Sequence, residues 1–509
     1  MLSDNKLIAY NTGILYLKLL LSVIIGLYTS RVILHALGAS DYGLYTVVGG
    51  IVSLLNIIGV TMVSTSYRYI SVEIGKGKDG NPNKIYNTVL VIHIALALIF
   101  IILGVIVGLW YVNNYLNVDT EKLSDARYVM VVSMITTAFS IIAVPSNGLI
   151  IAREKFLFTS CIEITQLILK LLLIVFILKP YGGNRLRLFA NMMAFITIIA
   201  PLVYTIYCYI KECDISKWKF NNCWQDYSNI IKFAGWMLVS TLSFMGVSQG
   251  SAMIMNVFFG TIVNAAFGIA NQVQKYLMMA PRMVLQAATP QIMKRIGEGN
   301  QERALSLVYL CTKYCFFVFL ILAVPCLFFM DEILKIWLGE VPTDTSKFTS
   351  FIIIATLIGS LTNGLDPLVM ASGKIRLFQI VYAIVFLSLL PIVYLMYSYG
   401  FPAYSNAVVM IGLNIISMIF QLYVASRVSD FKIKDYLRHT LFPTLIVAIS
   451  VLPLFLIRFV IPHVTLLKMC VSVFVILIWI VSTIWLFGLK NDEKEQILLS
   501  TKSLKDNNS

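Results

Sequence analysis

Charged residues and histidine are scarce in this chain of 509 residues. Asp, Glu, Lys and Arg together make up 13% of the sequence, against roughly 25% in a soluble domain, and only four His occur. Hydrophobic residues make up 59%. Such a chain has too little polar surface to cover a water-facing globule, so we expect lipid to be its solvent.

Motifs for catalysis, metal binding and nucleotide binding are also missing from the sequence. Most of the eight Cys lie inside apolar runs, and Cys311 and Cys315 have no His nearby to complete a metal site. We therefore expect neither a disulfide framework nor a zinc site. There is no P-loop, no zinc-finger or RNA-binding signature, and no loop long enough for a catalytic domain. The sequence predicts neither an enzyme nor a nucleic-acid-binding protein, and it predicts no bound cofactor.

Apolar runs long enough to cross a bilayer, which takes about 20 residues, are abundant. The first run continues through Arg31 to Leu37 without a small-residue cleavage site, so we expect a membrane helix there and not a cleavable signal peptide. The sequence thus predicts an all-α, polytopic membrane protein. Its fourteen predicted spans are roughly 9–31, 42–66, 87–112, 127–151, 157–179, 187–210, 230–257, 262–288, 305–330, 349–371, 376–399, 402–426, 438–460 and 465–488.

The distribution of Lys and Arg predicts how these helices are oriented. With the N-terminus inside, 24 of the 39 basic residues fall in inner segments and 9 in outer ones. Short cytoplasmic loops carry such an excess of positive charge. We therefore expect a multi-pass protein of the bacterial plasma membrane with both termini in the cytoplasm, although the loop 179–187 places three positive residues outside.

Two short motifs recur at one offset and suggest an internal repeat. Leu37-Gly38 returns as Phe259-Gly260, and Ile74-Gly75-Lys76-Gly77 returns as Ile296-Gly297-Glu298-Gly299, each 222 residues later. The offset spans six predicted helices, so the two halves would have the same orientation. We expect a first six-helix bundle, a cytoplasmic linker, a second six-helix bundle, two further helices and a fraying tail, at 1–210, 211–229, 230–426, 427–489 and 490–509.

Polar residues form a stripe along the predicted helix 262–288. Their spacings of 7, 4, 7 and 4 residues place them within an arc of about 60°, and the opposite face is apolar. Because intramembrane polar residues are costly and usually line a cavity or pathway, the stripe is a candidate substrate-binding surface. Arg282 could instead snorkel to a headgroup. The residues of the stripe are Asn264, Asn271, Lys275, Arg282 and Gln286.

The first helix repeats this pattern. Asn11, Lys18, Ser22 and Thr29 follow one another at spacings of 7, 4 and 7 residues and share one face. This face is a second candidate cavity surface. Alternatively, Lys18 pairs with an acid on a neighbouring helix.

Only a few acidic residues fall well inside the predicted spans. Glu163, Gln166 and Lys170 form one stripe, which is either an internal structural pair or the place of an ion-coupling carboxylate. Asp366 follows Asn363-Gly364 and precedes Pro367, a sequence that predicts a broken helix. It is either a cap of that break or a second ion-coupling candidate. Lys313, near the inner end of its helix, is expected to snorkel.

The opening of the chain resembles that of a known transporter family. The run Thr29-Ser30-Arg31-Val32-Ile33-Leu34-His35-Ala36-Leu37-Gly38, followed by Asp41-Tyr42-Gly43-Leu44-Tyr45, is similar to bacterial polysaccharide flippases of the O-antigen type. These belong to the multidrug/oligosaccharidyl-lipid/polysaccharide exporter superfamily. The loop 74–77 and Arg153-Glu154-Lys155 look similar too.

This resemblance implies two six-helix bundles around a central cavity that opens alternately to each side. It implies the flipping of undecaprenyl-pyrophosphate-linked oligosaccharides for lipopolysaccharide or other surface polysaccharides, with a proton or sodium gradient as the possible driving force. Polysaccharide polymerases or glycosyltransferases would be the partners. Cationic cavity residues are a theme of the family, and the matching candidates, placed by their helical faces, are Lys18, Arg31, Lys170, Lys275 and Arg282.

Two alternative functions remain open at this point. The first is an ion-coupled multidrug or toxin antiporter of the same superfamily. Such extruders typically use a carboxylate in an early helix, and this sequence has no acid inside its first two predicted spans. The second is a membrane-embedded enzyme of polysaccharide assembly, such as a polymerase or ligase, for which a large outer loop with catalytic polar residues would be expected.

Overall fold

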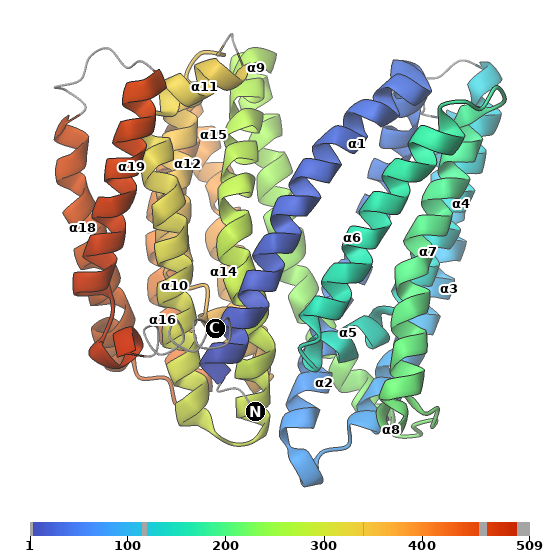
Figure 1. Cartoon of the computed structure of the whole chain (residues 1–509), viewed down its shortest axis with the longest axis horizontal. Helices are drawn as coiled ribbons and strands as arrows, with labels where there is room; N and C mark the ends of the chain where they lie inside the picture. Colours follow the sequence, from blue (N-terminus) through green and yellow to red (C-terminus); the bar gives the residue numbers. More distant parts are fainter. Residues whose placement is uncertain (1–3, 115–119, 339–340, 458–465, 496–509) are drawn as a thin grey trace, which may run out of the picture. The chain divides into compact units, whose positions relative to one another are not determined.

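The computed structural model describes residues 4–114, 120–338, 341–457 and 466–495. All regular structure in these ranges is helical, and none of it is a strand (Figure 1). This confirms the predicted all-α membrane fold. Within the described residues, ten helices are long and apolar enough to cross a bilayer, and a bent helix pair makes eleven. The other predicted spans, 9–31, 42–66 and 262–288, fall in the kinked helices α1 and α9 and in α2.

The chain divides into two compact units. Unit 2 comprises Tyr10–Leu238 and Met293–Gly299. In it α3 and α4 pack closely because Gly104 and Gly108 on α3 leave room for the sulfur atoms of Met134 and Met130. Helices α4 and α7 run alongside (Figure 1). Its helices are α1 (Asp4–Leu55, from Tyr10 on), α2 (Ile57–Gly75), α3 (Pro82–Asn114), α4 (Leu123–Ile142), α5 (Val144–Ala152), α6 (Phe156–Leu173), α7 (Arg185–Lys211), α8 (Cys213–Ser216) and the first part of α9 (Trp224–Gly297).

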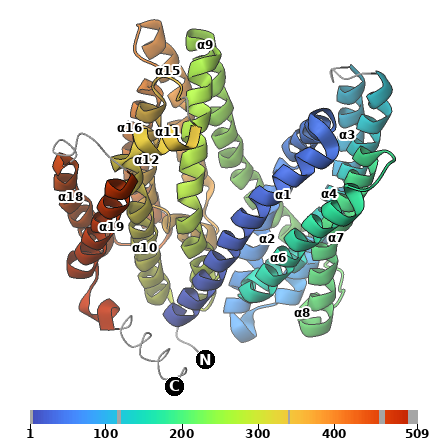
Figure 2. The same ribbon diagram turned by 45° about the horizontal axis from the view of Figure 1, so that its top comes forward.

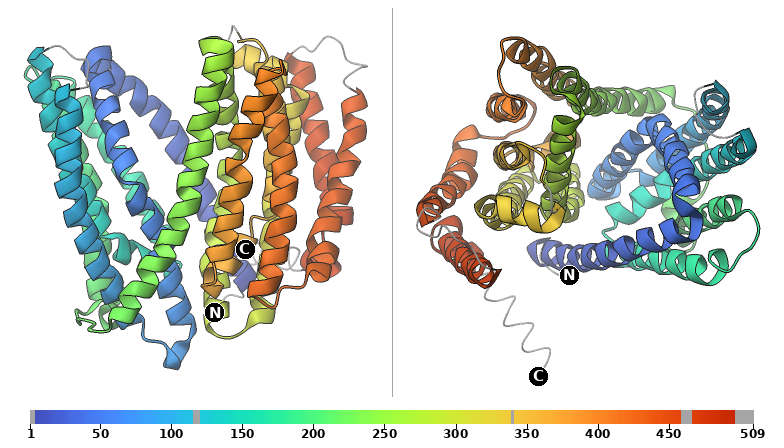
Figure 3. Two further views of the ribbon diagram at one scale, coloured as in Figure 1. Left: turned by 180° about the vertical axis from the view of Figure 1, so that it is seen from behind. Right: turned by 90° about the horizontal axis from the view of Figure 1, so that it is seen from above.

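Unit 1 comprises Met1–Ala9, Val239–Ile292 and Asn300–Ser509. Phe316, Phe317 and Leu320 of α10 form its core with the C-terminal helices α18 and α19 (Figure 2). The yellow α12 and the orange α16 also pack together (Figure 3). Besides the later part of α9, its helices are α10 (Gln301–Phe328), α11 (Met330–Leu338), α12 (Thr345–Ser360), α13 (Leu365–Ser372), α14 (Arg376–Leu387), α15 (Leu389–Ser398), α16 (Ser405–Val428), α17 (Ile433–Tyr436), α18 (Phe442–Ile457) and α19 (Leu466–Thr483).

The two repeated motifs adopt matching backbone conformations. Gly38 kinks α1 with φ 78° and ψ 165°, and Gly260 kinks α9 with φ 75° and ψ −167°. This region of backbone space is essentially open to glycine alone. Gly77 and Gly299 are likewise at positive φ, 59° and 77°. Both pairs keep the offset of 222 residues, which supports the internal repeat in three dimensions.

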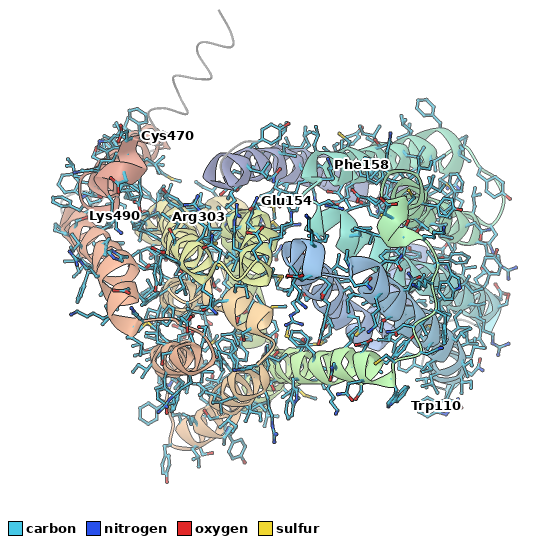
Figure 4. All side chains as sticks on the ribbon, turned by 90° about the horizontal axis from the view of Figure 1, so that it is seen from below. Trp110, Glu154, Phe158, Arg303, Cys470 and Lys490 are labelled. Carbon is cyan, nitrogen blue, oxygen red and sulfur yellow. The ribbon has the colours of Figure 1, made fainter. Side chains whose placement is uncertain are left out.

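Two segments related by the same offset of 222 residues cross closely inside unit 2, at the ends of α2 and α9. A Cβ atom on Gly75, at the end of α2, would lie 2.2 Å from the carbonyl oxygen of Lys294, and one on Gly297 would lie 2.2 Å from that of Val72. Each contact maps onto the other when 222 is added or subtracted. Only glycine permits this approach. Glu154, between α5 and α6 (Figure 4), forms an ion pair with Lys294 beside the crossing.

The predicted break near Asp366 is confirmed. Helices α12 and α13 meet at an angle of 46° across a gap of four residues. The backbone N–H of Gly364 donates a hydrogen bond of 3.1 Å to Oγ1 of Thr312 on α10, which partly compensates for the interrupted helix. At the corresponding place in unit 2, a single residue, Ala143, separates α4 from α5, and Pro145 precedes Pro367 by 222 residues.

Candidate functional site

Helices α1 and α6 of unit 2 are joined by an ion pair. Nζ of Lys18 lies 2.5 Å from a carboxylate oxygen of Glu163. This confirms the alternative in which Lys18 pairs with an acid on a neighbouring helix. The expected pairing of Glu163 with Lys170 is wrong, because the Glu163 carboxylate contacts Lys18 instead. The two side chains are 18% and 42% exposed, so the pair remains accessible.

The polar face of α1 is turned toward protein. Asn11 and Thr29 are buried, and the hydroxyl of Thr29 donates to the backbone oxygen of Ile25. Leu20 and Ile24, on the opposite face, are 62% and 66% exposed. This is the arrangement expected of a membrane helix with an apolar side in lipid. The amide nitrogen of Asn11 has no hydrogen-bond partner among the described residues, so this face retains unused polar capacity.

Only some side chains of the stripe on α6 contact other parts of the protein. Nε2 of Gln166 donates a hydrogen bond of 2.6 Å to the backbone oxygen of Ile196 on α7. Lys170 is partly buried one turn further along, and no ion pair is seen for it in the part of the chain that the structure describes. A partly buried ammonium group without an acid is an attractive place for an anion.

In unit 1 the stripe of α9 is exposed over about three turns. Lys275, Arg282 and Gln286 are exposed, whereas Ala266 and Ala270 on the other face are fully buried. For the cations no ion pair occurs among the described residues. If this helix spans the membrane as predicted, lipid would penalise exposed cations along it. The stripe therefore suits a water-filled pathway.

Of the remaining predicted substrate-binding residues, the structure describes the side chain of Asn271 but not those of Asn264 and Arg31. Asn271 is partly buried and returns a hydrogen bond of 2.9 Å to the backbone oxygen of Phe267 one turn earlier. Asn264 lies in α9 and Arg31 in α1, but their side chains lie outside the described residues. The structure places the predicted residues in two groups, Lys18, Glu163, Gln166 and Lys170 in unit 2, and Asn271, Lys275, Arg282 and Gln286 in unit 1.

Asp366 lies in the first turn of α13 and is exposed. Its carboxylate makes no hydrogen bond or ion pair within the described part of the chain, so the expectation that it caps the break is not met. The capping contact comes instead from Thr312. A carboxylate at this position is favoured by the N-terminal dipole of the helix. Asp366 is thus an accessible acid in a membrane-spanning segment.

Two buried cations lie outside the predicted stripes. Lys313 of α10 does not snorkel as expected, since it is only 1% exposed and lies 2.5 Å from the carboxylate of Glu493. Arg68 is buried in α2 with its guanidinium 4.2 Å and 4.9 Å from the ring centres of Tyr69 and Phe233. The acidic run after Lys490 is the only sequence signal for the contact of Lys313 with Glu493. The sequence carries no signal for the contact of Arg68 with the two aromatic rings.

Comparisons with known proteins identify the fold. A scan against models of protein families found no match, and a search of curated protein sequences found none either. Solved structures do match. An outward-facing multidrug resistance MATE family transporter of the MOP superfamily is 12% identical, with a TM-score of 0.69 over 84% of this chain and 96% of that chain.

Two further solved structures give the same result. A MOP superfamily transporter from Pyrococcus furiosus, described by the reverse polarity of its binding pocket and a different function, is 13% identical, with a TM-score of 0.67 over 84% of this chain and 96% of that chain. The Vibrio cholerae MATE transporter VcmN in its bent form is 16% identical, with a TM-score of 0.65 over 86% of this chain and 100% of that one. This chain therefore has a MATE-like fold.

Proposed function

We propose that this chain is a membrane transporter that moves an amphiphilic cargo by alternating access. The observation that carries the proposal is the exposed, cationic stripe of α9, on a helix whose opposite face is buried and which the sequence predicts to span the membrane. A MATE-like fold over 84% of the chain supports it. A transporter needs a polar path inside a lipid-facing shell, and such a stripe is the kind of surface that lines one.

The solved structures favour a multidrug cargo. A multidrug resistance MATE transporter is one of them, and VcmN is another MATE transporter, so an ion-coupled multidrug antiporter is the first candidate. It needs a titratable acid that is accessible from the pathway. Glu163, paired with Lys18, and Asp366, exposed in α13, are the candidates for that role.

The side chains of the stripe favour a lipid-linked oligosaccharide. Lys275 and Arg282 stand two turns apart, about 10 Å along the helix, with Gln286 one turn beyond. Cations bind phosphate oxygens in charge-assisted hydrogen bonds, and amides bind sugar hydroxyls. The second candidate is therefore a flippase for undecaprenyl-pyrophosphate-linked oligosaccharide in surface polysaccharide synthesis. Its proposed partners are polysaccharide polymerases or glycosyltransferases, and its proposed place is the plasma membrane.

One pair of assays in the same host separates the two cargoes. Restored surface polysaccharide in a strain that lacks its own flippase supports the second candidate. Gradient-driven efflux of a cationic dye from a strain that lacks its own drug exporters supports the first. A cell that gains dye efflux but no surface polysaccharide would contradict the flippase. Neither activity, with normal protein in the membrane, would contradict both.

A gradient-coupled transporter should depend on at least one of its accessible acids. We expect Glu163→Gln or Asp366→Asn to make transport insensitive to the proton gradient while expression stays normal. The double variant Lys18→Met with Glu163→Gln is the matched control, because it removes the charge of the acid without leaving Lys18 unpaired. Unchanged gradient dependence in all three variants would exclude both acids from coupling.

A further inference from the structure

Unit 2 contains an apolar cavity of about 650 Å³ between α2, α3 and the first part of α9. Met62, Ile92 and Ile99 line it on one side, and Ile231 and Leu238 line it on the other. Its volume lies within the range of small-molecule sites, about 300–1,000 Å³. None of the site residues discussed above lines this cavity.

The cavity has the length of one leaflet of a bilayer. Along α9 its lining runs from Trp224 to Leu238, which spans about 21 Å at 1.5 Å per residue. One leaflet, its headgroup region included, is roughly 20–22 Å thick, half of about 40–45 Å. Ile231 and Ile99 are 50% and 52% exposed, so the cavity is open along its side. A hydrocarbon chain that lies parallel to α9 fits this shape.

Phe220 and Trp224 line one end of the cavity, and Trp218 lies two residues before Phe220 in the chain. These three residues are 59%, 75% and 56% exposed, and tryptophan is enriched at membrane–water interfaces. Lys217 and Lys219 alternate with these aromatic residues and are exposed. Neither lysine forms an ion pair within the described residues.

The segment that carries these lysines is held in place by α3. The amide nitrogens of Asn83 and Asn87 donate hydrogen bonds of 2.8 Å and 3.0 Å to the backbone oxygen of Lys217. Asn221 bridges the hydroxyl of Thr88 and the carboxylate of Asp226. The rim of the cavity is thus built by several fixed contacts.

The acids near this end of the cavity leave a positive balance. Asp226 forms an ion pair of 2.7 Å with Lys84, and Glu212 forms one of 2.8 Å with Arg153. Asp214 is exposed and contacts the thiol of Cys213. Among these three acids only Asp214 has no basic partner in the described residues, against the two lysines Lys217 and Lys219, so the charge balance here is complementary to an anionic headgroup.

We propose that this cavity binds an anionic phospholipid, with one acyl chain between α2, α3 and α9 and the phosphate at Lys217 and Lys219. The predicted orientation assigns this lipid to the inner leaflet. The site is separate from the cation stripe of α9, and its occupancy is independent of which cargo the protein carries.

The test uses the full-length protein in phosphatidylcholine vesicles with a small fraction of phosphatidylglycerol or phosphatidylcholine that carries a photoactivatable acyl chain. Crosslinked peptides are quantified at α3 and the start of α9, and at α19 as a lipid-facing reference. We expect phosphatidylglycerol to label the cavity peptides several-fold more than phosphatidylcholine does, with equal labelling of α19. Two variants then separate the headgroup from the chain.

Lys217→Gln with Lys219→Gln should remove most of this several-fold preference for phosphatidylglycerol, because both lysines lose their attraction for the anionic headgroup. The matched control is Lys432→Gln with Lys434→Gln, an exposed pair at the same spacing, which should leave the preference unchanged. Gly235→Leu should abolish labelling by both lipids, because Gly235 lines the cavity and a Cβ there meets open space. Gly268→Leu, equally open on α9, controls for the fold.

Three results would overturn the proposal. Equal labelling by the two lipids would mean an ordinary lipid contact without headgroup recognition. Undiminished labelling in Gly235→Leu would place the chain outside the cavity. Displacement by a polyprenyl phosphate, but not by excess phosphatidylglycerol, would assign the cavity to the tail of a transported lipid.

Discussion

Lys18 on α1 and Lys275 on α9 lie in similar sequence patterns, but their contacts in the structure differ. Each follows an asparagine at a spacing of 7 or 4 residues, on a polar face of an apolar helix. Lys18 is neutralised by Glu163 of α6, whereas Lys275 is exposed, with no ion pair in the described residues. Helical periodicity identifies a polar face. It does not identify the residue that contacts this face, because that residue lies on a helix distant in sequence.

The difference separates two roles for cations inside the membrane. A paired cation such as Lys18 or Lys313 holds helices together, and removal of one partner leaves an uncompensated charge. An exposed cation without an ion pair among the described residues, such as Lys275 or Arg282, contributes little to packing. We expect substitutions of the first kind to change stability and those of the second kind to change transport.

The largest effect on stability is expected at the ion pair between α10 and the C-terminal segment. Glu493→Gln leaves the ammonium group of Lys313 buried without an acid, and breaking a buried pair in this way costs about 3–5 kcal/mol. Figure 4 labels Lys490, whose backbone N–H also donates to Glu493. Thermal unfolding in detergent should show the loss, and Lys313→Met with Glu493→Gln should recover much of it. An unchanged unfolding temperature in Glu493→Gln would refute a structural role for this pair.

A smaller effect is expected for Lys18 and Glu163, because both side chains are partly exposed. A double-mutant cycle with Lys18→Met and Glu163→Gln should give a coupling energy of about 1–2 kcal/mol, within the range for contacting residues. Unfolding in the same detergent measures it. Lys170→Met is the control on the same stripe and should show no coupling to Lys18. A coupling energy near zero would mean that the ion pair of Lys18 with Glu163 does not stabilise the protein.

The smallest effect on stability is expected for Lys275→Met alone. No ion pair of Lys275 is broken among the described residues, and surface substitutions of this kind usually change stability by less than about 0.5 kcal/mol. Transport should nevertheless fall, and Lys275→Arg should retain more activity because the charge remains. A fall in the unfolding temperature comparable to that of Glu493→Gln would show that Lys275 has a structural partner.

Cysteine labelling tests on which side of the membrane these groups lie, without any effect on stability. Cys213 and Cys223 are exposed, and both lie in the predicted cytoplasmic linker. A membrane-impermeant maleimide should modify them in inverted vesicles and not in intact cells. Labelling from outside in intact cells would reverse the predicted orientation of every helix.

Features that depend on local sequence were predictable. The apolar runs predicted the membrane helices, and Asn363-Gly364 before Pro367 predicted the break between α12 and α13. Each of these follows from residues within one or two turns. The repeat singled out Gly38 and Gly260, which were expected between separate helices and instead kink the continuous helices α1 and α9.

Contacts between distant segments were not predictable in the same way. Glu493 is 180 residues from Lys313, and it lies in a tail that was expected to fray. Glu163 had a nearer candidate partner in Lys170, which lies on the same stripe of the same helix. The pairing of Gly75 with Lys294 follows from the repeat only once the two segments are known to cross. Composition and periodicity carry no information about which helices become neighbours.

The central claim is that the cation stripe of α9 lines the transport path, and the double variant Lys275→Met with Arg282→Gln tests it most directly. Removal of two intramembrane charges should not impair insertion, since each costs about 2.5–3.5 kcal/mol at the helix centre. We expect normal protein levels in the membrane, an unfolding temperature close to that of the parent protein, and loss of transport in the assay that the parent supports. Lys275→Arg with Arg282→Lys should keep most of the activity. Full activity of the doubly neutral protein would contradict the claim.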